Sequence, residues 1–272
     1  MIHRFKKYFR LLKFICRGSN AVGWMERLRI SIRIQWALKN NKGRSASTLG
    51  EQLVLVNAIF EIPKSVPGAI AEFGCYKGLS SVALSIAAKH TGRKLIIFDS
   101  FEGLPEPVET ISHIADTSKL IYKKGDLAGS LEEVRAVVEK YGELSGVEFV
   151  KGYFCDTLPK RPKDERYALI FEDADLVESV RDVLRYAWPK LEQGCFFFSH
   201  EALDLEVVKL FYSDQFWNSV HGTNAPGLAG AGLGLPIDEG QWGTLKIPGW
   251  HGSCLAYCLK RQTECGQKSS DK

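Results

Sequence analysis

The sequence predicts an α/β fold in which a mostly parallel central sheet is covered by helices on both faces. From residue 69 onward, short apolar runs of strand length alternate with longer amphipathic runs of helical length. Polar residues follow directly after the apolar runs, where a ligand-binding edge of such a sheet would lie. The 272-residue chain shows no internal repeat and is long enough to bury a core without disulfides or structural metals.

The elements follow one another in a regular order. Thr48 and Glu51 have the spacing of a capping box and predict a helix that runs to about Ile62, where Pro63 ends it. We then expect strands near 69–73, 94–99, 147–151, 167–172 and 194–199, and helices near 79–90, 129–142 and 177–192. The three consecutive phenylalanines from position 196 indicate a buried central strand.

The first part of the chain differs in charge from the rest. Residues 1–48 are predicted to form a basic helical extension, residues 49–262 the α/β domain and residues 263–272 a polar tail. Residues 1–50 hold twelve Lys and Arg and one acid, whereas the remainder is mildly acidic. Within residues 1–17, apolar side chains share one helical face. This helix either packs on the domain or associates weakly with an anionic membrane; nucleic acid is not an expected partner.

Cysteine usage and hydropathy favour a cytoplasmic protein. The seven cysteines include no C-x-x-C pair, which argues against a disulfide framework and a zinc ribbon. No apolar run reaches the ~18 residues of a membrane span. Lys13 interrupts the N-terminal apolar stretch, and no small-residue cleavage site follows it. We expect a cytoplasmic location, either free or peripheral at the inner membrane surface.

The most informative segment lies between residues 67 and 105. An apolar strand carrying Glu72 runs into a Gly74-x-x-x-Gly78 turn, a helix and a second strand that ends at Asp99. Glycines allow close approach of a ligand, and an acidic residue after the second strand can accept hydrogen bonds from ribose hydroxyls. The dinucleotide pattern G-x-G-x-x-G is missing, and Glu72 disfavours a pyrophosphate. A cationic nucleoside such as S-adenosylmethionine fits better; an ordinary strand–turn–helix is the alternative.

Polar residues at five predicted strand ends mark the working edge of the sheet. They are Glu72, Asp99, Asp156, the pair Asp173 and Asp175, and the pair His200 and Glu201. The segment 100–125 is too long for a simple connector and is predicted to be a lid or substrate loop. The glycine-rich segment 221–236 is either a second lid or a plain flexible insertion.

Four strings of the sequence resemble one family. They are AEFGCYKGLSS, IIFDSFEGLPEP, KKGDLAGSLEEVRAVVEKYG followed by VKGYFCDTLP, and EDADLVESVRDVLRYAWPKLEQG. In this order and spacing, over roughly residues 49–201, they resemble the macrocin O-methyltransferase (TylF) family. The resemblance implies a Rossmann-like methyltransferase fold and methyl transfer from S-adenosylmethionine to a sugar hydroxyl, often of a glycosylated natural product. It also implies a divalent metal, Mg²⁺ or Mn²⁺, and a tendency to form homo-oligomers.

The resemblance also assigns a cofactor pocket. The methionyl part of S-adenosylmethionine is expected at Glu72, Gly74, Tyr76, Gly78 and Ser81. Asp99, with Ser100 beside it, is expected to hold the ribose, and Ser130, Tyr153 and Phe154 are expected near the adenine.

The metal and the general base are implied at two further strand ends. Asp173, His200 and Glu201 are the expected metal ligands, although the family usually has two acids where this chain has His200 and Glu201. An imidazole ligand favours Mn²⁺, Fe²⁺ or Zn²⁺ over Mg²⁺. Asp175 is the expected general base, with His200 as its catalytic partner. The alternatives are that Asp175 caps the helix beginning near Val177 and that His200 is structural.

Weaker candidates complete the prediction. His113 is a second candidate base, His221 and His251 are candidate pocket residues, and Trp217, Trp242 and Trp250 are candidate stacking residues, although packing is the simpler role for each. We expect an S-adenosylmethionine-dependent O-methyltransferase acting on a sugar or a glycosylated small molecule. The alternatives are a non-catalytic relative that has lost the metal site and a nucleotide-binding Rossmann protein.

Overall fold

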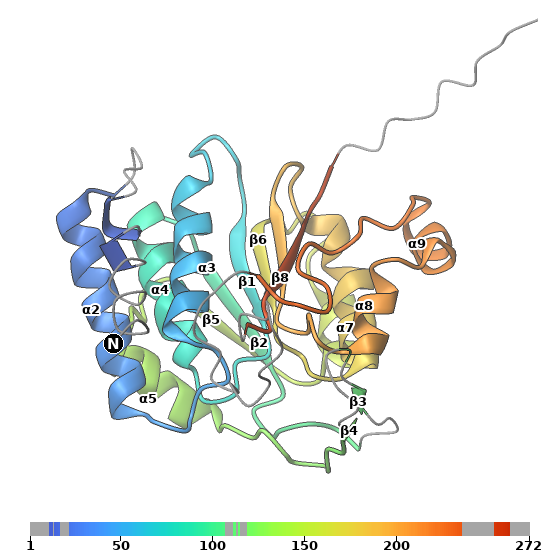
Figure 1. Cartoon of the computed structure of the whole chain (residues 1–272), viewed down its shortest axis with the longest axis horizontal. Helices are drawn as coiled ribbons and strands as arrows, with labels where there is room; N and C mark the ends of the chain where they lie inside the picture. The colour runs from blue at the N-terminus through green and yellow to red at the C-terminus, as the bar shows by residue number, and fades with distance from the viewer. Residues whose placement is uncertain are drawn as a thin grey trace, which may run out of the picture.

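The central element is a six-stranded sheet with the strand order β5-β2-β1-β6-β7-β8 (Figure 1). The computed structural model describes residues 11–12, 14–16, 22–106, 111–112, 114, 119–235 and 253–261. The strands are β1 (Ala69–Phe73), β2 (Leu95–Asp99), β5 (Val147–Lys151), β6 (Tyr167–Glu172), β7 (Phe196–Ser199) and β8 (Ala256–Leu259). The first five pair in parallel and β8 pairs antiparallel to β7, which confirms the mostly parallel sheet.

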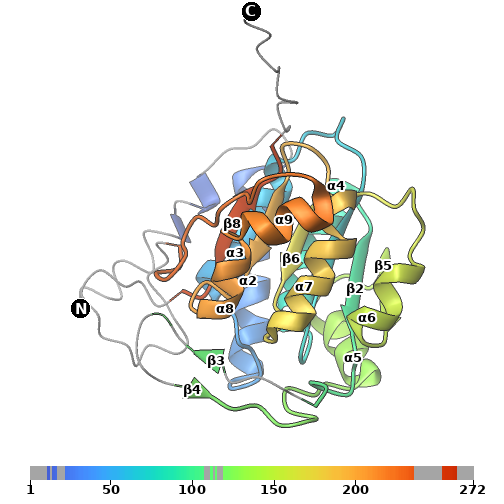
Figure 2. The same cartoon turned by 90° about the vertical axis from the view of Figure 1, so that its right-hand side faces the viewer.

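Helices cover both faces of this sheet (Figures 1 and 2). On one face lie α2 (Trp24–Asn40), α3 (Leu49–Glu61), α4 (Leu79–Thr91) and α5 (Leu131–Tyr141); on the other lie α6 (Phe154–Thr157), α7 (Val177–Tyr186), α8 (Leu205–Leu210) and α9 (Asp214–His221). Side chains alternate along each strand, so that Ile70 packs into the first layer and Ala71 into the second. The expected two-sided coverage of the sheet is therefore confirmed.

Most predicted elements are present with small changes at their ends. The capping box of α3 forms, with the backbone N–H of Glu51 donating to Oγ1 of Thr48 at 3.3 Å, and the helix ends at Glu61. The helix expected over 177–192 ends at Tyr186, and a 3₁₀ turn, Trp188–Lys190, follows it. Pro189 explains this end, because proline has no backbone N–H to continue the helix.

The helical extension packs against the domain through α2. Arg27 is fully buried, and its guanidinium donates to the carbonyl of Phe14 at 3.2 Å and to Oδ1 of Asn57 at 3.0 Å. Most of the amphipathic segment 1–17 lies outside the described residues, as does the tail from 262. In the part of the chain that the structure describes, no helix has the length and apolar character needed to cross a membrane.

The two long segments reach the same end of the sheet. Within 100–125, the short strands β3 (Ile111–Ser112) and β4 (Lys119–Leu120) pair, and the backbone N–H of Ile114 donates to the carbonyl of Leu203 at 2.8 Å. The glycine-rich segment is described as far as residue 235. It runs beside β8, where Ala229 bridges to Tyr257.

Candidate functional site

The turn after β1 brings the backbone of the glycine-rich motif against the end of β6. Gly74 has a φ of +84°, and a Cβ atom there would lie 1.9 Å from the carbonyl oxygen of Asp173. Tyr76 also has a positive φ, +48°, although it carries a side chain. Gly78, with a φ of +78°, precedes the first residue of α4. The sequence motif is thus a tight turn that only glycine at position 74 allows.

Glu72 lies at this turn as a fully buried acid near the hydroxyls of Ser80 and Ser81. It is fully buried, and neither carboxyl oxygen has a hydrogen-bond partner among the described residues. The hydroxyl of Ser81, at the start of α4, is likewise buried without a partner among them. Burial raises the pKa of Glu72 to about 8, against the opposing effect of the Ser80 and Ser81 hydroxyls. A carboxyl that is buried without a hydrogen-bond partner is suited to bind a cationic group.

Asp99 stands beside the same turn at the end of β2. Its Oδ2 accepts from the backbone N–H of Cys75 at 2.8 Å, and its Oδ1 accepts from that of Phe101 at 2.7 Å. Burial raises the pKa of Asp99, while these hydrogen bonds oppose the rise. Each carboxylate oxygen retains a further lone pair for a ribose hydroxyl. Ser100 donates to the carbonyl of Gly103 at 2.7 Å and so shapes its own turn.

Two of the three residues expected near an adenine, Tyr153 and Phe154, come directly after β5, next to Asp99. The backbone N–H of Gly152, just after β5, donates to the Asp99 carbonyl at 2.9 Å, which brings Tyr153 and Phe154 to this edge. The ring of Phe154 contacts that of Phe73 edge-on at 5.8 Å between centroids. Ser130 is exposed and caps α5 by accepting from the backbone N–H of Glu133 at 3.2 Å.

Asp175 follows β6 and faces a tyrosine from the long segment. The hydroxyl of Tyr122 donates to Oδ1 of Asp175 at 3.0 Å. Asp175 has a φ of +60°, an unusual conformation for a residue with a side chain and one that is common at functional sites. Burial, followed by the negative charge of Asp173, raises the pKa of Asp175 to about 8. The alternative that Asp175 caps α7 is wrong, because the helix is preceded by Leu176 and has no side-chain cap.

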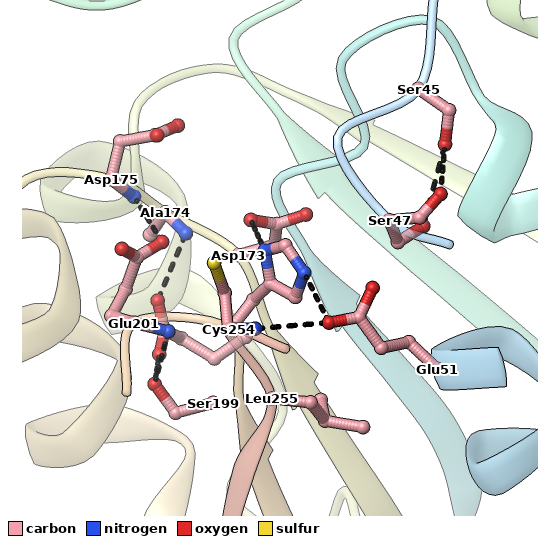
Figure 3. Close-up of polar contacts among 12 residues, drawn as sticks. Ser45, Ser47, Glu51, Asp173, Ala174, Asp175, Ser199, Glu201, Cys254 and Leu255 are labelled. Atoms are coloured by element: carbon pink, nitrogen blue, oxygen red, sulfur yellow. Dashed lines mark hydrogen bonds and ion pairs between the residues drawn. The ribbon is translucent and has the colours of Figure 1, made fainter. Parts of the chain in front are cut away.

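His200, just after β7, lies between two carboxylates. Its Nδ1 is 3.1 Å from Oδ1 of Asp173, and its Nε2 is 3.5 Å from Oε1 of Glu51; both of these acids are labelled in Figure 3. Burial would lower the pKa of His200, but the charges of Asp173 and Glu51 hold it well above its ordinary value. Burial would raise the pKa of Glu51, but His200 and hydrogen bonds to Thr48 and Ser253 bring it below its ordinary value.

The expected metal ligands, Asp173, His200 and Glu201, do not fit a divalent ion in this arrangement. A carboxylate oxygen faces each ring nitrogen of His200, that of Asp173 at 3.1 Å from Nδ1 and that of Glu51 at 3.5 Å from Nε2. Oε1 of Glu201 accepts from the backbone N–H of Asp175 at 3.3 Å, and burial raises the pKa of Glu201 well above its ordinary value. Among the described residues, no group of three His, Cys, Asp or Glu side chains is arranged to hold a metal.

The sequence did not predict four further residues that lie at this edge of the sheet: Glu51, Tyr122, Glu172 and Ser199. Glu172 is fully buried at the end of β6, where its Oε1 accepts from the backbone N–H of Ala174 at 2.9 Å and its Oε2 from the Ser199 hydroxyl at 2.7 Å. Its position directly before Asp173 was a usable signal. Glu51 carried only the signal of a helix cap, and Tyr122 carried none.

Several weaker candidates take packing roles. Trp217 is fully buried and donates from Nε1 to the carbonyl of Leu210 at 2.9 Å. His221 packs on Trp217 and lies 3.1 Å from the carbonyl of Leu184. Neither residue is therefore placed to bind a substrate. His113, Trp242, Trp250 and His251 lie outside the described residues.

Comparison with known proteins agrees with the fold. The model of the family described as macrocin-O-methyltransferase (TylF) matches residues 51–226. The 8-demethyl-8-(2,3-dimethoxy-alpha-L-rhamnosyl)-tetracenomycin-C 4'-O-methyltransferase of Streptomyces olivaceus is 43% identical over 136 residues, 48% of this chain and 51% of that protein. The demethyldecarbamoylnovobiocin O-methyltransferase of Streptomyces niveus is 34% identical over 138 residues, 49% of this chain and 52% of that protein. The chain thus spans about half the length of the curated relatives it matches.

Solved structures resemble the fold over a longer range. The O-methyltransferase NovP matches with a TM-score of 0.63 at 19% identity, covering 86% of this chain and 99% of that one. CalS11, a calicheamicin methyltransferase, matches with a TM-score of 0.51 at 18% identity, covering 89% and 94%. At such identities the likeness concerns the fold, whereas the family model matches well over half of the chain. The chain therefore belongs to the macrocin O-methyltransferase (TylF) family.

Proposed function

We propose that this protein is an S-adenosylmethionine-dependent O-methyltransferase that acts on a hydroxyl of a sugar or a glycosylated small molecule. The observation that carries the proposal is Glu72, a fully buried carboxyl without a hydrogen-bond partner among the described residues, beside the tight turn in which Gly74 packs against the backbone of Asp173. An ammonium group is the natural partner of such a carboxylate. Membership of a methyltransferase family supports the same cofactor.

The cofactor would be held along the ends of β1, β2 and β5. Glu72 and the Ser81 hydroxyl would receive the amino group, and the free lone pairs of Asp99 would accept from the ribose hydroxyls. Tyr153 and Phe154 would cover the adenine. When bound, S-adenosylmethionine supplies a methyl group on a positively charged sulfur, which is the electrophile of the reaction.

The acceptor hydroxyl would lie against Asp175. Its pKa of about 8 makes Asp175 a base that is partly ionised near neutral pH and still a good proton acceptor. The acceptor oxygen would take the methyl group that the bound cofactor supplies, and the cofactor sulfur would keep the electron pair of the broken bond. The hydroxyl proton passes to the Asp175 carboxylate. Tyr122 orients that carboxylate through its 3.0 Å hydrogen bond.

A glycosylated acceptor is proposed from the relatives. The Streptomyces olivaceus relative is named for a rhamnosyl tetracenomycin, and a Micromonospora griseorubida relative, 32% identical over 138 residues, is named as mycinamicin III 3''-O-methyltransferase. Because the chain spans about half of each, the acceptor class stays part of the proposal. The proposal does not include assistance by a metal, because the arrangement of Asp173, His200 and Glu201 does not fit a divalent ion.

Self-association and membrane association remain separate predictions. For the basic segment 1–17, deletion should reduce sedimentation with anionic vesicles at low salt, whereas equal sedimentation of both proteins would favour packing on the domain.

Isothermal titration calorimetry tests the cofactor assignment. We expect S-adenosylmethionine to bind and NAD to give no signal, and Asp99→Ala to weaken binding at least about tenfold through loss of charged hydrogen bonds. Unchanged affinity of Asp99→Ala would remove the ribose role, and binding of NAD alone would replace the proposal with the dinucleotide alternative.

Initial rates with a glycoside acceptor test the base. The rate should rise with pH as Asp175 loses its proton near pH 8, because only the carboxylate accepts the hydroxyl proton. Tyr122 lowers the pKa of Asp175, so Tyr122→Phe should move the midpoint to higher pH. Tyr212→Phe, at an exposed tyrosine, should leave it unchanged. An identical profile in all three proteins would exclude Asp175 as the base.

A further inference from the structure

The contact between Glu51, His200 and Asp173 joins elements far apart in the sequence. Glu51 belongs to the first turn of α3, His200 follows β7 and Asp173 follows β6. The side chains of His200 and Glu51 are 6% and 2% exposed and that of Asp173 is 17% exposed, so little water separates them. The sheet edge and a helix that precedes the whole sheet in sequence therefore meet in one buried polar cluster (Figure 3).

Each ring nitrogen of His200 has a carboxylate opposite it. Nδ1 lies 3.1 Å from Asp173, and Nε2 lies 3.5 Å from Glu51, a charge contact rather than a direct hydrogen bond. An ionised carboxylate only accepts hydrogen bonds, so a nitrogen facing one is favourable as N–H. With both nitrogens so placed, the geometry favours a ring that carries two protons and a positive charge. A ring in that state has no lone pair for a metal.

Glu51 cannot readily leave this position. Its Oε2 accepts from the backbone N–H of Thr48 at 2.7 Å and from the Thr48 hydroxyl at 2.9 Å. Its Oε1 accepts from the Ser253 hydroxyl at 2.8 Å and from the backbone N–H of Cys254 at 3.0 Å. Four hydrogen bonds from two segments hold the carboxylate in place, and the helix cap and the site share one side chain.

We propose that the His200 imidazole, held between the carboxylates of Asp173 and Glu51, occupies the place of the divalent ion expected from the family, so that this group of residues does not hold a metal. Methyl transfer by this protein is then independent of divalent metals, and Glu51 is a positioning residue that acts through His200. The inference rests on the proposed function and specifies which groups fill its acidic edge. The His200 ring lies between the carboxylates of Asp173 and Glu51, to which ring N–H groups are favourable partners.

Binding of Mn²⁺ to the full-length protein, followed by electron paramagnetic resonance with and without S-adenosylhomocysteine, tests the absence of a metal. We expect no saturable binding by the wild type. His200→Asp would place another carboxylate beside Asp173, Glu51 and Glu201 and should bind Mn²⁺ at least about tenfold more tightly than the wild type. Saturable binding by the wild type that disappears in Asp173→Asn would overturn the proposal.

Nitrogen-15 NMR of the histidine rings tests the clamp itself, with His200 assigned from the spectrum of His200→Gln. At pH 7 both ring nitrogens of His200 should show shifts of protonated nitrogen. Glu51→Gln should change the Nε2 shift, whereas Glu61→Gln, at the far end of the same helix, should leave it unchanged. An unprotonated ring nitrogen in the wild type would refute the clamp.

The cofactor assignment and the metal-free site can be refuted separately. Calorimetry with S-adenosylmethionine on the same preparations reports on the proposed function, and loss of that binding would remove the function whatever the metal result. Normal binding of S-adenosylmethionine together with saturable Mn²⁺ binding by the wild type would refute only the proposal that the site holds no metal.

Discussion

Glu72 makes the stability of the ligand-free protein depend on pH in a way that a single substitution can reveal. The carboxyl is fully buried, and its pKa rises from an ordinary value of 4.5 to about 8. Below pH 4.5 the group is protonated in both the folded and unfolded states and costs no ionisation energy. As the pH rises from 4.5 to 8, the unfolded chain ionises first, so stability is lost. At about 1.4 kcal/mol for each pKa unit, the loss reaches at most about 5 kcal/mol.

Glu72→Gln should remove this pH dependence while keeping the shape of the side chain. In urea unfolding without cofactor, the variant and the wild type should have similar free energies of unfolding at pH 4.5. By pH 8 the variant should be more stable by a few kcal/mol, within the limit of about 5 kcal/mol. Glu132→Gln, at an exposed position of α5, should show a difference below about 0.5 kcal/mol at both pH values.

The same variant separates stability from binding. Glu72→Gln should lose most affinity for S-adenosylmethionine in calorimetry, because a neutral amide replaces the carboxylate that would receive the ammonium group. A stability difference between Glu72→Gln and the wild type that stays constant from pH 4.5 to pH 8 would refute the buried, protonated state of Glu72. Unchanged affinity for the cofactor would refute its binding role.

Two further substitutions test the packing that supports the site, each with a matched control and each measured by urea unfolding. Gly74→Ala should lower the free energy of unfolding by about 3 kcal/mol or more, because the added Cβ would lie 1.9 Å from a carbonyl oxygen. The control Gly92→Ala, at a φ of +70° with open space around it, should lower it by about 1 kcal/mol. Equal losses in the two variants would contradict the close approach at Gly74. Arg27→Ala should cost about 3 kcal/mol through loss of buried charged hydrogen bonds, and Arg29→Ala, whose side chain is 76% exposed, should cost under about 0.5 kcal/mol. A small effect of Arg27→Ala would mean that α2 is held mainly by its apolar contacts.

The sequence predicted those parts of the site that depend on local pattern. Glu72, Asp99, Asp173 and His200 follow or end apolar strand-length runs, and parallel strands bring such positions to one edge of a sheet. The turn at Gly74 was also predictable, because the spacing of its glycines is a local feature of the sequence.

Contacts between distant segments were not predictable in this way. Glu51 has a complete local explanation as a helix cap, so nothing in the sequence indicated that its second oxygen reaches His200 across the domain. Tyr122 lies in a segment without periodicity, and its contact with Asp175 depends on how that segment folds over the edge. The strand β8 was missed because it follows a long segment without regular pattern and joins the sheet antiparallel.

The contact between Gly74 and the Asp173 carbonyl has a consequence for how such an enzyme could be retargeted. The separation between the cofactor turn and the acidic edge is set there by main-chain atoms in van der Waals contact, rather than by side chains that vary readily. With Tyr122 kept against Asp175, the rest of segments 100–125 and 203–235 can therefore change in length and sequence without altering the distance between this turn and Asp175. We expect acceptor choice in this scaffold to be exchangeable by grafting those segments, with position 74 kept as glycine.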